Sequence, residues 1–128
     1  MATRLSLSDE ARHVLANWYD RSLIDDTPLY LGSFFGWLFG RSGQHAVTLN
    51  GKVHVTSSAP DINTHMGIML IGHELFHAEE QRRRGWWPYI ISYLLRWRPR
   101  HIRDGRSHPM ERDAYARGDE VWRMLQGS

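Results

Sequence analysis

The sequence predicts a mostly helical α+β fold, with a small antiparallel hairpin packed beside one long helix. Three observations support this prediction. Residues 64–84 carry start and stop signals for a single helix, residues 45–56 alternate around a two-residue turn, and residues 107–115 open with a capping pattern typical of a further helix. A chain of 128 residues is long enough for one core but short for two.

The N-terminal third is predicted to begin with a helix, because Ser8 can cap it while Asp9 and Glu10 favour its first turn. Pro28 separates this helix from residues 29–40, which are rich in aromatic residues and glycine. As a helix, that segment would be apolar almost all round. We therefore expect it in the core. A glycine-hinged flap over a cleft and a lipid-facing segment are the alternatives.

Residues 45–56 are predicted to form a β-hairpin, because Asn50-Gly51 is the strongest two-residue turn signal and both arms alternate. A single hairpin is marginally stable alone and needs helices behind it. In peptidases, an exposed strand edge near the metal can accept an extended peptide by β-pairing. This hairpin is our candidate for such an edge.

The predicted helix over residues 64–84 begins after the N-cap Thr64 and stops at Gly85, with a basic last turn. Gly72 leaves room for another part of the chain to approach closely. The apolar residues available for burial on this helix are Ile68, Met69, Leu70, Ile71, Leu75 and Phe76.

Residues 73–77 of this helix read His-Glu-Leu-Phe-His. Histidines four apart project from the same face of a helix, so the imidazoles of His73 and His77 can bind one metal ion. Glu74 points about 100° round the helix, so it can stand beside the metal and take a proton from water. This pattern is typical of zinc hydrolases. It also arises by chance in histidine-rich chains, but the helical setting and a downstream ligand argue against chance.

A catalytic zinc ion needs a third protein ligand and an open position for water. The metzincin extension would place glycine and histidine where this chain has Glu80 and Arg83, which excludes that subclass. We predict Glu111 as the third ligand, from a helix that begins near Pro109. The alternative role of Glu111 is to favour the helix dipole. Glu80 is the rival ligand, although its direction on the helix does not favour it.

A further hydrogen-bond donor should face the oxyanion of the reaction. The candidates are Tyr93, His101, His108 and Tyr115, and their spacing does not choose among them. We include Tyr115 with Glu74 in the expected catalytic set.

These residues resemble small single-domain gluzincin-type proteins, the minigluzincins and related bacterial His-Glu-x-x-His families, over roughly residues 45–118. The resemblance implies that His73, His77 and Glu111 bind one zinc ion per chain and that Glu74 is the general base. Some similar domains are embedded in larger particles and toxins. Thermolysin-like gluzincins carry a second-shell aspartate where this chain has Tyr115, with Asp119 one turn later. The resemblance rests on Gly72–His77, Gln81, Gly85, Tyr93, Pro109, Glu111, Ala114 and Tyr115, together with the hairpin.

Residues 82–106 combine eight arginines with the apolar run Trp86–Trp97. Pro88 favours a helix start and Pro99 stops it. We expect this helix to pack inward, linking the zinc helix to the Glu111 helix. The alternative is an interfacial helix that docks on anionic lipid. It is too short to span a bilayer, which needs ~20 apolar residues.

Composition limits the metal ligands, the partners and the cellular compartment that this protein can have. The absence of cysteine leaves histidine and carboxylate as ligands and fits a reducing compartment. A net charge of +2 is smaller than the positive charge typical of proteins that bind nucleic acid. Residues 1–20 lack the pattern of a secretory signal, so we expect a cytoplasmic protein.

We therefore expect one domain over residues 1–128, divided into an N-terminal helical and aromatic region (1–44) and a zinc-site core (45–128). The predicted function is a zinc metallopeptidase that cleaves peptide or protein substrates. The alternatives are a zinc-binding assembly module with little turnover and a membrane-surface accessory protein. The sequence indicates no oligomeric state.

Overall fold

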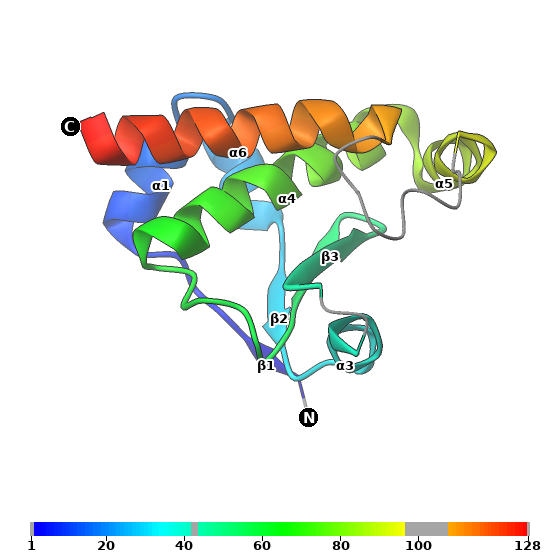
Figure 1. Ribbon diagram of the computed structural model, residues 1–128, viewed down its shortest axis with the longest axis horizontal. Helices are drawn as coiled ribbons and strands as arrows, with labels where there is room; N and C mark the ends of the chain where they lie inside the picture. The colour runs from blue at the N-terminus through cyan, green and yellow to red at the C-terminus, as the bar shows by residue number, and fades with distance from the viewer. Residues whose placement is uncertain (1, 42–43, 97–107, 128) are drawn as a thin grey trace.

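The computed structural model describes residues 2–41, 44–96 and 108–127. Within these ranges, helices surround a small mixed sheet, which confirms the predicted mostly helical α+β fold (Figure 1). The elements, in chain order, are β1 (Thr3–Arg4), α1 (Asp9–Leu15), α2 (Arg21–Asp26), β2 (Leu29–Leu31), α3 (Phe34–Gly40), β3 (Ala46–Leu49), β4 (Lys52–Val55), α4 (His65–Arg84), α5 (Trp86–Leu95) and α6 (Pro109–Gly127).

The sheet has the strand order β1-β2-β4-β3. The predicted hairpin is confirmed, since β3 and β4 pair in antiparallel fashion around Asn50 and Gly51, whose φ angles are 50° and 75°. Positive φ at both central residues is what a type I′ turn requires. The pairing of β2 with β4 is parallel and that of β1 with β2 is antiparallel. Neither β1 nor β2 was predicted, because strands of two or three residues are too short to show alternation.

The predicted helix ends are also confirmed. The Thr64 hydroxyl accepts a hydrogen bond from the Gly67 amide at 3.2 Å, and Gly85, with a φ of 84°, ends α4. At the start of α6, the amide of Met110 donates to Nδ1 of His108 at 3.0 Å, so His108 caps the helix before Pro109. Ser107, at which the predicted capping pattern begins, lies outside the described residues.

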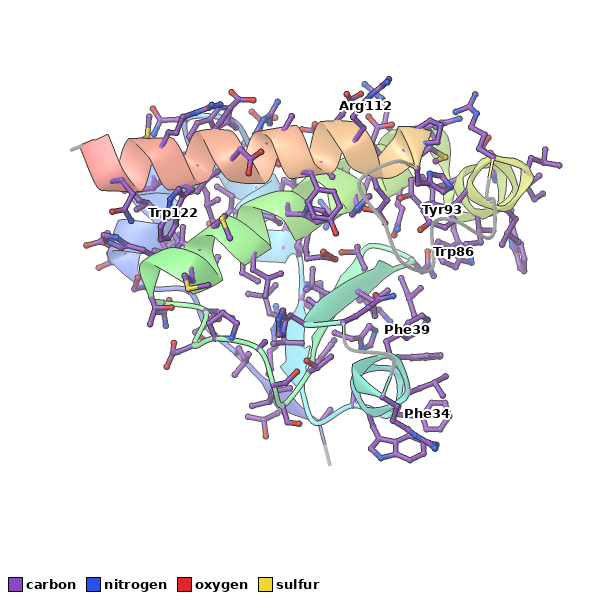
Figure 2. The ribbon with its side chains drawn as sticks, viewed as in Figure 1. Phe34, Phe39, Trp86, Tyr93, Arg112 and Trp122 are labelled. Atoms are coloured by element: carbon purple, nitrogen blue, oxygen red, sulfur yellow. The ribbon has the colours of Figure 1, made fainter. Side chains whose placement is uncertain are left out.

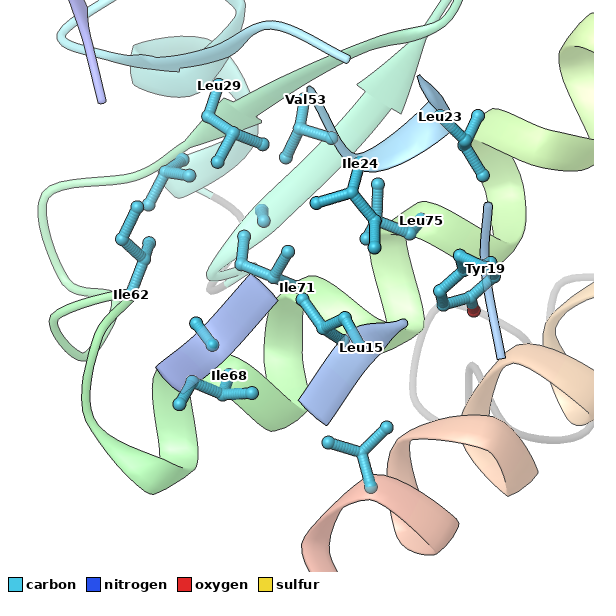
Figure 3. Close-up of a cluster of buried hydrophobic side chains, with 14 of the residues drawn as sticks. Leu15, Tyr19, Leu23, Ile24, Leu29, Val53, Ile62, Ile68, Ile71 and Leu75 are labelled. Carbon is cyan, nitrogen blue, oxygen red and sulfur yellow. The ribbon is translucent and has the colours of Figure 1, made fainter. Parts of the chain in front are cut away.

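The core lies between α4 and the sheet, with α1 and α2 closing one side (Figure 3). On the opposite side, α6 runs along α4 (Figure 1). Gly72 permits this approach, because a Cβ atom there would lie 2.8 Å from Cγ2 of Val121 on α6. The central buried side chains are Leu15, Leu23, Ile24, Leu29, Val53, Ile68, Ile71 and Leu75.

The expectation that residues 29–40 lie in the core is wrong for α3. Phe34 and Trp37 are 65% and 58% exposed. The cause is Gly36, which faces the sheet so closely that an added Cβ atom would lie 2.9 Å from the carbonyl oxygen of Val55. Because α3 rests on β4 through its glycine face, Phe34 points away from the sheet (Figure 2) and Trp37 is also exposed, whereas Phe35 still contacts the ring of His54 on β4.

The expectation that α5 packs inward is also wrong for most of that helix. Tyr89 is buried, but Trp87 and Leu95 are 71% and 73% exposed. The reason is that α6 packs directly on α4, so α5 does not lie between the two helices it joins (Figure 1). Trp97 and Pro99, the end of the helix in that prediction, lie outside the described residues. No helix in the described part of the chain has the length and apolar character that a bilayer span requires.

Candidate metal centre

Helices α4 and α6 bring together two histidines and one glutamate. Nε2 of His77 lies 2.7 Å from Oε1 of Glu111, and Nε2 of His73 lies 3.3 Å from the same oxygen. One potential ligand atom from each residue falls within 4.8 Å of the others. Two imidazole nitrogens and a carboxylate oxygen at this spacing could hold one metal ion.

The cluster is buried on one side and accessible on the other. The side chain of His77 is 7% exposed, whereas those of His73 and Glu111 are 13% and 20% exposed. His73 and Glu111 are therefore partly accessible to solvent, while His77 is buried.

The three side chains bring a carboxylate next to imidazole groups, and a bound metal ion would replace the positive charge of an imidazole proton. Burial alone would raise the pKa of Glu111, but hydrogen bonds from His73 and His77 outweigh burial and hold that pKa far below its usual range. Burial alone would lower the pKa of His77, yet the hydrogen bond and charge of Glu111 raise it. The cluster therefore favours a carboxylate beside positive charge, and a cation would compete with the imidazole proton.

Glu74 stands beside the cluster without joining it, as the helical repeat predicts. Its Oε2 atom lies 3.6 Å from Nε2 of His73. Its Oε1 atom accepts a hydrogen bond at 2.9 Å from the hydroxyl of Thr48 on β3. The sequence patterns did not identify Thr48 as part of the site. The available signal was a polar residue on the inward face of the predicted hairpin.

Two tyrosines of α5 complete the surroundings. The hydroxyl of Tyr89 lies 2.8 Å from Nδ1 of His77, and the hydroxyl of Tyr93 donates to Oε2 of Glu111 at 3.2 Å. Burial and the charge of Glu111 raise the pKa of both phenols, so both keep their protons at neutral pH. The sequence indicated Tyr89 only as part of the apolar run Trp86–Trp97, because its partner lies on another helix.

Gln81 fixes the hairpin to α4. Its Nε2 atom donates to the carbonyl of Thr48 at 2.9 Å, and its Oε1 atom accepts from the amide of Gly51 at 2.7 Å. Since Thr48 also holds Glu74, these contacts set the position of the carboxylate relative to His73 and His77.

The structure distinguishes between the other residues that were predicted as metal ligands or catalytic residues. Glu80, the rival ligand, pairs with Arg83 and Arg84 and lies outside the cluster. The ring of Tyr115 packs edge-on against the ring of His73, with centroids 4.4 Å apart. Tyr115 therefore lies beside the centre, and its catalytic role stays a prediction.

His108 is not placed to face an oxyanion. It is fully buried, its Nε2 atom lies 2.9 Å from the carbonyl oxygen of Tyr93, and its Nδ1 atom accepts from Met110. Both ring nitrogens thus serve the packing of α6 on α5, which corrects its listing as a donor candidate. His101 lies outside the described residues.

Comparison with known proteins identifies one family. The sequence profile of the eCIS core domain, named for extracellular contractile injection systems, matches residues 6–85. The match includes His73, Glu74 and His77 and ends before Glu111. No curated protein and no solved structure matches the chain. The comparisons therefore give no support to a gluzincin fold, and the likeness to gluzincins is limited to the ligand cluster and its motif. Because the match covers more than half of the chain, this protein belongs to the eCIS core domain family.

Proposed function

We propose that this protein is a zinc-dependent hydrolase, and specifically a metallopeptidase, that acts within a contractile injection-system assembly. The observation that carries the proposal is Glu74, which Thr48 holds beside the cluster of His73, His77 and Glu111. A carboxylate next to a three-ligand site, and outside it, suits a general base.

The donor set fits zinc. Imidazole nitrogen and carboxylate oxygen are ordinary zinc ligands, and a site with three protein ligands leaves a position open. When bound, zinc would supply Lewis acidity, which lowers the pKa of a water molecule to roughly 7. His73, His77 and Glu111 would hold the ion. Tyr89 would orient His77 through its Nδ1 atom.

Glu74 accepts the proton of the attacking water and passes it to the leaving amine in this proposal. Its second carboxylate oxygen stays bonded to Thr48, which keeps the group aimed at the centre. Among the described residues, Tyr93 and Tyr115 remain candidates for a donor to the oxyanion, because both lie beside the cluster. Tyr93 retains its proton, which it would have to redirect from Glu111.

Strand β3 offers a route for a peptide substrate. Among the described residues, β3 pairs with β4 on one side only. The bonded pairing of His45 with Thr56 places the backbone groups of Ala46 and Thr48 on the opposite edge, because bonded and non-bonded pairs alternate. Gln81 occupies the carbonyl of Thr48. The amide and carbonyl of Ala46 would be the first groups to pair with an extended peptide.

Metal content and cleavage test the proposal together. The wild-type protein should retain near-stoichiometric zinc and cleave members of a mixed peptide library. His77→Ala should lose the zinc. Glu74→Gln should keep the zinc and cleave about 10²–10⁴-fold more slowly, because the amide cannot act as the base.

Glu79→Gln is the matched control, because Glu79 is on the same helix and lies near Tyr19, away from the cluster. Cleavage that is equal in the wild type and Glu74→Gln would mean a contaminating protease. Equal trace amounts of metal in the wild type and in His77→Ala would show that these residues do not form a metal centre.

The second candidate is an assembly module in which the metal stabilises the α4–α6 pair with little turnover. The family match favours it, because an injection system is a multi-protein assembly. Zinc-loaded wild-type protein that cleaves nothing in a broad library, while zinc removal lowers its melting temperature, would select this candidate.

A further inference from the structure

We propose that the outer faces of α3 and α5 form a docking surface for an anionic lipid bilayer. We call this surface the α3–α5 face. It goes beyond the proposed hydrolysis and does not depend on it. Its residues are Phe34, Phe35, Trp37 and Leu38 on α3, and Trp87, Ile91, Leu94 and Leu95 on α5.

Exposure is the first observation. The eight side chains of the α3–α5 face are between 42% and 73% exposed. Single exposed apolar residues are normal, but a group of this size on two helices marks an interaction site. The two helices lie at the same end of the molecule, away from α1 (Figure 1).

Both helices pack against the rest of the protein through the faces opposite to the α3–α5 face. Helix α3 contacts the sheet through Gly36 and Gly40, next to Val55 and Thr56. Helix α5 turns its tyrosines inward, with Tyr89 buried against His77. The outer faces are therefore left over after the fold is complete, and burying them would not require α3 or α5 to unfold.

The charge of the residues around the α3–α5 face indicates an anionic partner. Residues 27–60 and 81–96 contain no aspartate or glutamate. Arg41 lies over the ring of Trp37, with its guanidinium carbon 5.1 Å from the ring centroid, and Arg96 follows the last turn of α5. Apolar and Trp-rich helix faces with basic ends are typical of helices that bind anionic membranes. The basic residues of the two stretches are Arg41, Lys52, Arg82, Arg83, Arg84 and Arg96, of which Arg83 and Arg84 pair with Glu80.

A bilayer also suits the shape of this surface better than a protein does. Protein hot spots are aromatic side chains that fill pockets of a shaped partner. The side chains of the α3–α5 face are divided between two separate helices, and each helix presents a convex surface. A fluid bilayer accommodates such ridges without a matching pocket, and tryptophan and arginine suit its headgroup layer.

Docking would bring the metal centre to the membrane surface. Trp87 lies two residues before Tyr89, and the Tyr89 hydroxyl contacts Nδ1 of His77. One helix therefore separates the lipid-facing side chains from the centre, a thickness of about 10 Å. Polypeptides held at a bilayer surface would then be within reach of the centre.

Vesicle flotation tests the proposal with the purified full chain. We expect the wild type to float with vesicles that contain phosphatidylserine, and not with phosphatidylcholine alone, and to be partly released by high salt. Trp87→Ala/Leu94→Ala and Phe34→Ala/Trp37→Ala should each lower the partition coefficient by roughly tenfold or more. All four positions are exposed, so thermal melting and zinc content should stay unchanged.

Met66→Ala/Met124→Ala is the matched control, because both methionines are exposed and lie on α4 and α6. The control should bind vesicles as the wild type does. The proposal is overturned if the wild type does not float, if neutral vesicles bind it equally, or if the control loses as much binding. Concentration-dependent self-association that Trp87→Ala/Leu94→Ala abolishes, without vesicle binding, would assign the face to a second copy of the chain.

Discussion

Tyr89→Phe should weaken zinc binding without disturbing the packing of α5. In the structure, Nε2 of His77 faces Glu111 at 2.7 Å, so Nε2 would be the ligand atom and Nδ1 would carry the proton when a metal ion is bound. Nδ1 would then donate to the hydroxyl of Tyr89, which lies 2.8 Å away. Phenylalanine keeps the ring that stacks between Trp86 and Tyr93 and removes the acceptor.

The size of the effect follows from the burial of the pair. Tyr89 is 4% exposed and the side chain of His77 is 7% exposed, so water cannot easily replace the lost partner. A hydrogen bond to a buried group that carries charge contributes about 1.5–3 kcal/mol. Since 1.4 kcal/mol is a factor of ten, the dissociation constant for zinc should rise roughly 10- to 150-fold. Outer-shell partners of zinc-bound histidines typically give losses of about 10–100-fold.

The assay is competition with a chromophoric chelator at a fixed pH of about 7.5, above the ordinary pKa of histidine. Tyr19→Phe is the matched control. The hydroxyl of Tyr19 is also buried and donates to the carbonyl of Gly72 at 2.7 Å, but it contacts no potential ligand. It should lower stability by about 1 kcal/mol and leave zinc affinity unchanged. Equal zinc affinity in Tyr89→Phe and the wild type, or equal losses in both variants, would refute this role for Tyr89.

Three further predictions concern the surroundings of the centre. Thr48→Val should keep the zinc but lower cleavage about tenfold, because Glu74 loses its 2.9 Å hydrogen bond; zinc content and turnover measured on one sample decide this. Gly72→Ala should lower the free energy of unfolding in denaturant titration by about 1–3 kcal/mol, and Val121→Ala should partly rescue it, because the added Cβ atom would lie 2.8 Å from Cγ2 of Val121. Burial, with a smaller effect from Lys52, lowers the pKa of His54, so its contribution to stability is present above about pH 6.5 and is lost as pH falls toward the lower folded-state pKa. As the pH is lowered, the melting temperature of the wild type should therefore fall relative to that of His54→Phe. A difference that stays constant with pH would contradict this.

Local patterns in the sequence determined several features of this protein. The i, i+4 spacing of His73 and His77 requires only a helix to place both imidazoles on one face. Thr64 and Gly85 bound that helix through interactions with their own neighbours. The Asn50-Gly51 turn is equally local, because it depends on two φ angles. Each of these features was predicted because its cause lies within a few residues of its effect.

Tertiary packing decided which distant side chains meet the histidines. Glu111 lies 34 residues after His77 and reaches it because Gly72 and Gly118 let α6 lie close along α4. Thr48 reaches Glu74 only through the docking of the hairpin on α4. Spacing along the chain cannot rank Glu80 against Glu111, since the choice depends on how two helices cross.

Packing also decided which apolar side chains are buried, and here the prediction from sequence was wrong for α3 and α5. Hydrophobic periodicity identifies an apolar surface but does not say what covers it. In α3 the glycine face of Gly36 and Gly40 contacts the sheet, so the aromatic face is turned outward. In α5 the partly polar Tyr89 is turned inward because its hydroxyl has a partner in His77, and the purely apolar Leu94 and Leu95 are exposed. The sequence contained the apolar residues of both helices, and only the contacts made by their opposite faces determined that these residues point to solvent.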